Sequence, residues 1–486
     1  MVRSRFVLGM ALGIAGLFIA ASPLRAQVSN AGHAPETPAP KVVSPWRGVG
    51  AVEPCVLPWG GIYACPPAPA TVAIRAGRMF DSIKGAMLTK QVVLIQGQRI
   101  TEVGPDGSVT IPPGARVIDL SQATVLPGFI DSHNHFMTAR GKMTGDQALL
   151  VATKRLRDAL ENGFTSLKEM TSHGNGYQDV TLRDMINLGV VIGPRVQVSG
   201  RGIVWGGPTP GPKDKPDPEM LNAIVIHNVE EAKAAVRLEV DHGVDHIKLY
   251  PVGPWKFSPT GELQFEMTYP LEIMQALDDE AQRLGVRTGS HAYGGQGLQN
   301  AITAAHAGDS IEHGQGLSQE MCNEMAKKGL FYSPTILEYS HPAIEDADAK
   351  STGGKYNIVP IFKKNVRMCI ATKGLVTVFG SGSQGSAWAE GTNALEFAAL
   401  VNIGGMTPAA ALQAGTINAA TEMRWQNDLG SITKGKFADI VALSGDPLAD
   451  INETQKVKFV MKGGEIFRND FAPGTIGAMT LSGEIR

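Results

Sequence analysis

The 486-residue sequence has few cysteines and no excess of either charge. Four cysteines in a chain of this length exclude a small scaffold held together by disulfides. The 44 basic and 46 acidic residues leave a net charge of −2, so nucleic acid is not an expected partner, because binding it requires a basic surface. Hydrophobic residues reach 43%, which excludes global disorder, and the length favours one large barrel-type domain or two domains that share a core.

The sequence also lacks a clear membrane-spanning segment. Its N-terminal apolar run, Phe6 to Ala21, is about 16 residues long, whereas a spanning helix needs roughly 20. Arg3 and Arg5 precede this run and small residues follow it up to Ala26, which is the layout of a secretory signal peptide. We therefore predict that residues 1–26 are cleaved and that the mature protein is periplasmic or secreted, with no membrane contact; a membrane anchor is the alternative.

Residues 27–70 form a leader rich in Pro, Ala and Gly, without sustained periodicity. Cys55 and Cys65 lie ten positions apart in it, around a turn-prone Pro-Trp-Gly-Gly sequence. An oxidising compartment would favour a short-loop disulfide between them, with two free thiols as the alternative. Cys322 and Cys369 fall in amphipathic helical patterns, which favours packed, reduced core residues.

Short β-type segments separated by turns occupy both ends of the remaining chain. Residues 71–124 hold four of them, and residues 429–486 hold two more, with Gly463-Gly464 as a hairpin turn. The two regions are predicted to pair into one small β-sandwich.

Residues 125–428 between them repeat strand, loop and helix. Eight apolar strand candidates alternate with amphipathic helices, and eight is the number that closes a (β/α)8 barrel. Several helices are followed by a glycine that can adopt the positive φ of a helix C-cap. A doubly wound open sheet is less well supported, since no glycine-rich phosphate loop follows the first strand. The strand candidates are 125–131, 164–168, 194–199, 245–250, 286–290, 309–312, 330–333 and 375–380.

Potential metal ligands follow several of these strands at the point where each ends. His133 and His135 follow the first strand, two residues apart and so on one face of an extended chain. His291 follows the fifth strand and His313 the sixth. Lys248 is expected to point into the barrel from the fourth strand, where a lone ammonium is costly. It would therefore pair with an acid such as Asp245 or Glu312, lose its proton, or be modified to a carbamate.

The sequence resembles the amidohydrolase superfamily, and within it the imidazolonepropionase-like branch, which includes Xaa-Pro dipeptidases and enzymes that hydrolyse aryl amides. The similarity extends from about residue 71 to residue 467. It is carried by the motifs LPGFIDSHNH, GFTSLKEM, IGPRVQVSGRGI, HIKLY, GSHAYG, SIEHG and GSITKGKFADIVALSGDPL.

This resemblance implies an α/β fold with a distorted (β/α)8 barrel, a small β-sandwich formed by the N- and C-terminal segments, and one or two ions of Zn2+ or a similar divalent metal. His133 and His135 would bind the more buried ion, and His291 and His313 the second. Lys248, carbamylated, would bridge the two ions.

Two positions depart from the family pattern. Relatives normally carry an aspartate at the end of strand eight, where it contacts the buried metal and takes a proton, whereas this chain has Gly382. Ser381 or Ser383 could relay protons instead, with water, although hydroxyl groups are poor bases. After strand three, Gly206-Gly207 is followed by Pro208 where relatives often have histidine.

We therefore expect a metal-dependent hydrolase that cleaves an amide C–N bond of a small molecule, such as a dipeptide, an N-acyl amino acid or a cyclic amide, by metal-bound hydroxide. The alternative is a catalytically impaired binding protein, motivated by Gly382. A Ser-His-Asp hydrolase has little support, because GSGSQG resembles a nucleophile elbow only loosely. Tyr250 and Tyr293 could bind substrate or simply pack, and a homo-oligomer is possible. The remaining histidines are predicted not to be ligands: His33, His173, His227, His242, His306 and His341.

Overall fold

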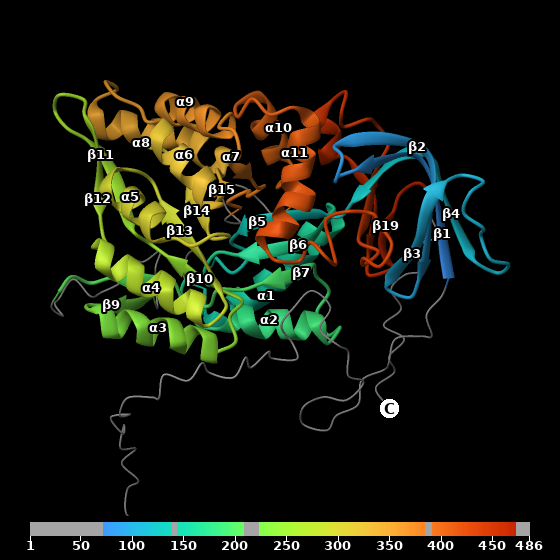
Figure 1. The fold of residues 1–486 in the computed structure, drawn as a ribbon, viewed down its shortest axis with the longest axis horizontal. Coiled ribbons are helices and arrows are strands. Elements are labelled where there is room, and N and C mark those ends of the chain that lie inside the picture. Colours follow the sequence, from blue (N-terminus) through green and yellow to red (C-terminus); the bar gives the residue numbers. More distant parts are fainter. Residues whose placement is uncertain (1–70, 139–142, 209–222, 384–390, 473–486) are drawn as a thin grey trace, which may run out of the picture. The chain divides into compact units, whose positions relative to one another are not determined.

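A computed structural model describes residues 71–138, 143–208, 223–383 and 391–472 (Figure 1). The fold is α/β, and its described residues form one mixed peripheral sheet, two parallel sheets that make up the barrel, and a separate two-stranded antiparallel sheet. The predicted signal peptide, the leader and the Cys55–Cys65 bridge lie outside the described residues. Among the described residues, no helix combines the length and the apolar character needed to cross a membrane.

The two predicted β-rich regions are joined in one seven-stranded sheet, in the order β19-β18-β17-β4-β1-β2-β3. The N- and C-terminal parts meet where β4 pairs antiparallel with β17. The sheet also folds back on itself, because Ile100 at the start of β3 exchanges backbone hydrogen bonds with Gly435 and Lys436 ahead of β17. The strands are β1 (Thr71–Asp81), β2 (Ala86–Gln96), β3 (Arg99–Pro105), β4 (Arg116–Pro127), β17 (Ile440–Leu443), β18 (Val457–Lys462) and β19 (Glu465–Asn469).

Each barrel strand overlaps one of the eight candidates of the sequence, although most bounds differ by one or more residues and the start of the first strand differs most. Residues up to Pro127 belong to β4, and the first barrel strand begins at Phe129. The strands run parallel in two hydrogen-bonded groups, and backbone bonds from Ser132 to Phe379 and from Asp245 to Val198 connect the groups. The barrel strands are β5 (Phe129–Asn134), β6 (Phe164–Glu169), β7 (Arg195–Gln197), β10 (His246–Leu249), β13 (Arg287–Ala292), β14 (Ser310–His313), β15 (Phe331–Ser333) and β16 (Val376–Thr377).

Helices alternate with these strands along the chain (Figure 1), and six of the described helices are followed within two residues by a glycine with positive φ. These are α1 (Gly145–Glu161), α2 (Gln178–Asn187), α3 (Val229–Asp241), α4 (Leu271–Arg283), α6 (Gln319–Lys328) and α8 (Pro342–Thr352). The others are α5 (Gly295–Ala304), α7 (Ile336–Ser340), α9 (Val359–Ile370), α10 (Leu395–Asn402), α11 (Pro408–Gln413), η3 (Ala414–Asn418), α12 (Ala419–Glu422) and η4 (Ile451–Gln455). Short strands in the connections are β8 (Ile203–Trp205), β9 (Ile224–Ile226), β11 (Val252–Phe257) and β12 (Leu263–Met267).

The expectation that Cys322 and Cys369 are reduced is wrong. Both are fully buried, and they form a disulfide between α6 and α9 with a Cα–Cα distance of 5.3 Å. The helical patterns in the sequence identified the burial correctly, but they could not show that the two helices pack with these residues face to face.

This bridge is expected to stabilise the fold by about 4 kcal/mol, because it closes a loop over a sequence separation of 47 residues. The variant with both Cys322→Ala and Cys369→Ala should lose that free energy of unfolding, measured by denaturant titration. Intact-mass measurement of the parent should show a gain of two hydrogens for this bridge on reduction. An unchanged mass together with unchanged stability of the double variant would contradict the bridge.

Candidate metal centre

The predicted ligands meet at the carboxyl ends of the barrel strands, where active sites of such barrels form. His133 lies in β5 and His135 directly follows it, while Lys248 comes from β10, and His291 and His313 come from β13 and β14. Nε2 of His133 lies 3.3 Å from Nε2 of His135, and Nε2 of His313 lies 2.9 Å from Nδ1 of His291. The His133 and His313 rings are themselves adjacent, with centroids 4.8 Å apart. The structure thus brings all four imidazoles together.

A buried carboxylate orients His133. Nδ1 of this ring lies 2.6 Å from Oε2 of Glu312, and both side chains are buried. Burial, reinforced by the charge of Lys248, lowers the pKa of His133 to about 4, so the ring is neutral at pH 7. Burial alone would raise the pKa of Glu312, but His133 and Lys248 lower it to about 2. The ionised Glu312 therefore accepts a hydrogen bond from Nδ1–H, which leaves the Nε2 lone pair for a metal.

A threonine fixes His313 in the same way. Oγ1 of Thr335 donates to the carbonyl of Pro334 and lies 2.7 Å from Nδ1 of His313. Since the hydroxyl proton is already used, Thr335 accepts from Nδ1–H, and the Nε2 of His313 keeps its lone pair. Burial lowers the pKa of His313 and of His291 well below 6.5, so both rings are in the neutral form that ligates metals.

Lys248 lacks the ion pairs considered for it. Asp245 pairs with Arg183 at 2.9 Å, and Glu312 pairs with His133. Among the described residues, Nζ of Lys248 is buried without a hydrogen-bond partner. Burial lowers its pKa to about 8, although nearby carboxylates oppose the shift. A substantial neutral fraction is thus present near pH 8, as carbamate formation requires.

A second group of ligand-type side chains adjoins the first. His135, Glu169 and His173 place ligand atoms within 4.8 Å of one another, and the His135 and His173 rings have centroids 4.4 Å apart. The prediction that His173 lies away from any ligand geometry is therefore wrong. It sits in the loop that follows β6, and that position at a strand end was the signal that could have identified it.

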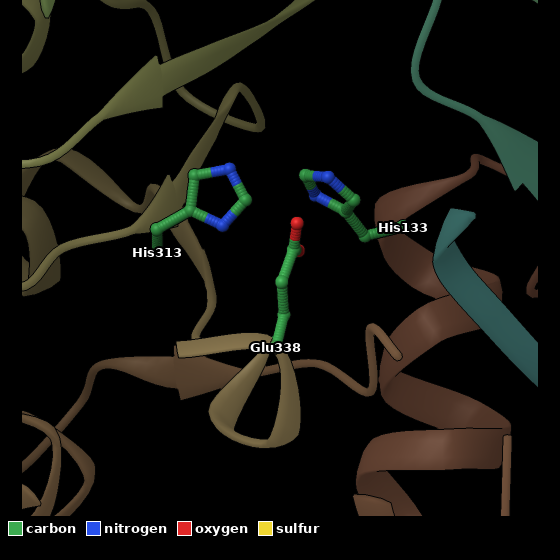
Figure 2. Close-up of side chains that lie close together, drawn as sticks. All are labelled: His133, His313 and Glu338. Atoms are coloured by element: carbon green, nitrogen blue, oxygen red, sulfur yellow. The ribbon is translucent and has the colours of Figure 1, made fainter. Parts of the chain in front are cut away.

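A carboxylate that sequence reasoning missed completes the other group. His133, His313 and Glu338 place ligand atoms within 4.8 Å of one another, and Figure 2 shows the Glu338 carboxylate directed between the two rings. Glu338 belongs to α7, a short helix that follows β15.

Residues 378–383, the described residues directly after β16, contribute no side-chain acid. Gly382 has φ +63°, and a Cβ atom built on it would lie 2.1 Å from Oε2 of Glu338. Ser381 donates its hydroxyl to Asp131 at 2.6 Å and accepts from the backbone N–H of Ser383 at 3.0 Å. The Ser381 hydroxyl is thereby held by a buried carboxylate of β5.

Both predicted substrate tyrosines lie against His291. The centroid of Tyr250 is 5.1 Å from that of His291, and the centroid of Tyr293 is 4.4 Å from it. The hydroxyl of Tyr293 is also 2.9 Å from the hydroxyl of Tyr339 on α7. The two phenols therefore line one side of the imidazole cluster.

The backbone is strained around the imidazole cluster. Four of the non-glycine residues with positive φ follow or end barrel strands: Thr171, His173, His313 and Thr335. Such conformations are costly and persist where the surrounding structure enforces them, which is typical of active sites.

Comparison with known proteins gives consistent matches. The model of the amidohydrolase family matches residues 124–467. Ochratoxinase from Aspergillus niger is 26% identical over 423 residues, covering 79% of this chain and 84% of that protein. A solved Xaa-Pro dipeptidase with methionine in its active site is 26% identical, with a TM-score of 0.71, covering 82% of this chain and all of the other. The solved A. niger ochratoxinase, at 23% identity and a TM-score of 0.69, shows the likeness in fold.

Proposed function

Because the chain belongs to the amidohydrolase family, we propose that it is a metal-dependent hydrolase that cleaves an amide C–N bond in a small molecule. The observation that carries the proposal is the convergence of four neutral imidazoles, three of them buried and that of His291 partly buried, with the buried Lys248 at the carboxyl ends of the barrel strands. This arrangement supports catalysis rather than structure alone, since so many buried polar groups at one point destabilise a fold that does not use them.

The side chains present fit a divalent ion. Neutral imidazole is the usual nitrogen donor for Zn2+, and a carbamate on Lys248 would add an oxygen donor. The buried Nδ1 of His135 and Nζ of Lys248 have no hydrogen-bond partner among the described residues, as expected of groups arranged for a ligand. We propose that His133, His135, Lys248, His291 and His313 hold one or two ions.

Such an ion would lower the pKa of water at the site and polarise the scissile carbonyl. The chain's own groups then have separate tasks. Glu312 keeps His133 in the tautomer with a free Nε2, and Thr335 does the same for His313. Tyr250 and Tyr293, which line the imidazole cluster, are placed to donate hydrogen bonds to a carbonyl or carboxylate of the substrate.

We propose a substrate in which the amide joins an acyl group to an amino acid, such as a dipeptide or an N-acyl amino acid. The name of one solved relative supports this class, because an Xaa-Pro dipeptidase acts on a dipeptide.

Removal of metal is expected to abolish turnover. Protein purified without chelator should hydrolyse at least one member of a panel of dipeptides, N-acyl amino acids, cyclic imides and lactones. Treatment with a chelator should eliminate that activity, and one to two equivalents of zinc should restore it. If the zinc-loaded protein hydrolyses nothing in the panel, the proposal fails and the binding-protein alternative is favoured.

We further propose that the protein is exported. The disulfide between Cys322 and Cys369 supports an oxidising compartment, because such bridges are rare in the cytosol. Intact-mass analysis of the secreted or periplasmic fraction should show a chain that starts near Gln27; retention of Met1 would contradict export by cleavage.

A further inference from the structure

We propose that Glu338 takes the place of the acid that the family carries at the end of strand eight. The inference rests on the proposed hydrolase function and extends it by assigning the residue that moves the proton. The observation behind it is that residues 338 and 382, which are far apart in the sequence, compete for the same space in the structure. The space that a side chain on Gly382 would fill is already filled by the carboxylate of Glu338.

The overlap between a side chain at position 382 and the Glu338 side chain is large. A Cβ atom on Gly382 would approach Oε2 of Glu338 to 2.1 Å, and it would also lie 3.0 Å from Cδ and 3.1 Å from Cβ of that residue. No side chain fits at position 382 while Glu338 keeps this conformation. Glycine at position 382 thus leaves room for the Glu338 side chain. We therefore infer that the absence of an acid at position 382 and the presence of one at position 338 are linked.

The carboxylate lies where the replaced acid is needed. Its ligand oxygen is within 4.8 Å of the ligand atoms of His133 and His313, one from each of the two predicted metal positions (Figure 2). A carboxylate between these two rings can contact an ion held by His133 and can accept a hydrogen bond from the attacking water.

The helix that carries Glu338 is anchored at the site. The buried carboxylate of Glu396 on α10 accepts hydrogen bonds from the backbone N–H groups of Ile336 and Leu337, at 2.8 and 2.9 Å. The preceding residue, Thr335, has φ +45° and contacts His313 through its hydroxyl. The N-terminal end of α7 is therefore fixed by Glu396 and His313, and Glu338 lies within one helical turn of these contacts.

The proposed step is balanced in atoms and electrons. Water attacks the amide carbonyl and forms the new C–O bond, while Oε2 of Glu338 takes one proton from that water. When the C–N bond breaks, the same oxygen returns the proton to the leaving nitrogen, which departs as an amine. No further reactant is needed, and the carboxylate is regenerated.

Four variants test this exchange: Glu338→Ala, Glu338→Gln, Gly382→Asp and the double variant with Glu338→Ala and Gly382→Asp. The control is Glu345→Gln on α8, an exposed glutamate that is not part of the site. Two quantities are measured, the affinity of the metal-free protein for zinc, by competition with a chromophoric chelator, and kcat for a substrate found in the panel.

Glu338→Ala is expected to weaken zinc binding by about 10-fold or more and to lower kcat by roughly 10²–10⁴-fold, the range for loss of a positioned acid–base group. Glu338→Gln keeps the shape of the side chain but cannot take the proton, so it should lose a similar factor in kcat. Gly382→Asp alone should impair the protein, because two carboxylates would compete for one space. The double variant should recover at least 10-fold in kcat over Glu338→Ala, since aspartate tolerates positive φ better than most residues.

A folded Glu338→Ala variant with parental zinc affinity and parental kcat would overturn the inference while leaving the hydrolase proposal intact. So would a folded double variant that is no better than Glu338→Ala in either quantity. A parent protein that binds no zinc would instead overturn the proposed function, and the inference with it.

Discussion

Replacing Lys248 with alanine is expected to reduce bound zinc to at most one equivalent and to lower amide turnover by roughly 100-fold or more, the upper end of the loss caused by removing a group that supports a metal site. Nζ of Lys248 is buried, and its pKa is lowered to about 8. An amine in this state can add carbon dioxide and present two oxygens, which alanine cannot do. Lys256→Ala, at an exposed position of β11, is the matched control.

A carbamate on Lys248 would also make zinc binding depend on bicarbonate. Reconstitution of the metal-free parent with zinc should become faster as bicarbonate is added, and Lys248→Ala should show no such dependence. Equal zinc content in the parent and the Lys248→Ala variant would contradict the assignment of this residue as a ligand.

Breaking a buried ion pair in the barrel is expected to have a large effect on stability. Lys168 on β6 and Glu422 on α12 are both almost fully buried, with Nζ and Oε1 2.5 Å apart. Lys168→Met should cost about 3–5 kcal/mol of unfolding free energy, because it leaves a carboxyl group buried without its partner. Burial already raises the pKa of Glu422, and Lys168 is the main group that opposes the shift.

The double variant with Lys168→Met and Glu422→Leu should regain most of that loss, since two apolar groups of similar size need no partner. Denaturant titration of the parent, the two single variants and the double variant completes the cycle. If Lys168→Met costs less than about 1 kcal/mol, the pair is not the buried charge interaction described above.

The barrel could be predicted from the sequence because its strands are short apolar runs that end in polar residues. β5 shows this well, since it begins with the buried apolar pair Phe129 and Ile130 and ends in polar residues that include the predicted ligand His133. The start of the barrel could not be placed as accurately. One continuous apolar stretch serves the peripheral sheet up to Pro127 and the barrel from Phe129, and hydrophobicity alone does not distinguish the two environments.

The part of the site that escaped prediction comes from loops and short helices. Glu338 lies on a five-residue helix after β15, too short to leave a periodic signal, and it reaches the site only through the anchoring of that helix by Glu396. His173 was missed for a similar reason, because its loop after β6 adopts positive φ at two non-glycine residues. Side chains carried by irregular backbone cannot be placed from strand periodicity.

The interpretation of Gly382 differs between the sequence and the structure. Judged from the motif alone, a missing aspartate suggests impaired catalysis, and its restoration would be the natural experiment. In the structure the same glycine leaves room for a carboxylate from another element. The motif alone would predict that Gly382→Asp raises kcat, whereas the structure predicts that this variant alone lowers kcat.

The central claim is that this barrel holds a divalent metal centre that includes Lys248. X-ray diffraction from crystals of protein purified without chelator, recorded above and below the zinc absorption edge, tests it most directly. The account predicts anomalous density for one or two ions among His133, His135, Lys248, His291 and His313, with carbamate density on Nζ of Lys248. Absence of anomalous density at that position, with an unmodified Lys248, would contradict it.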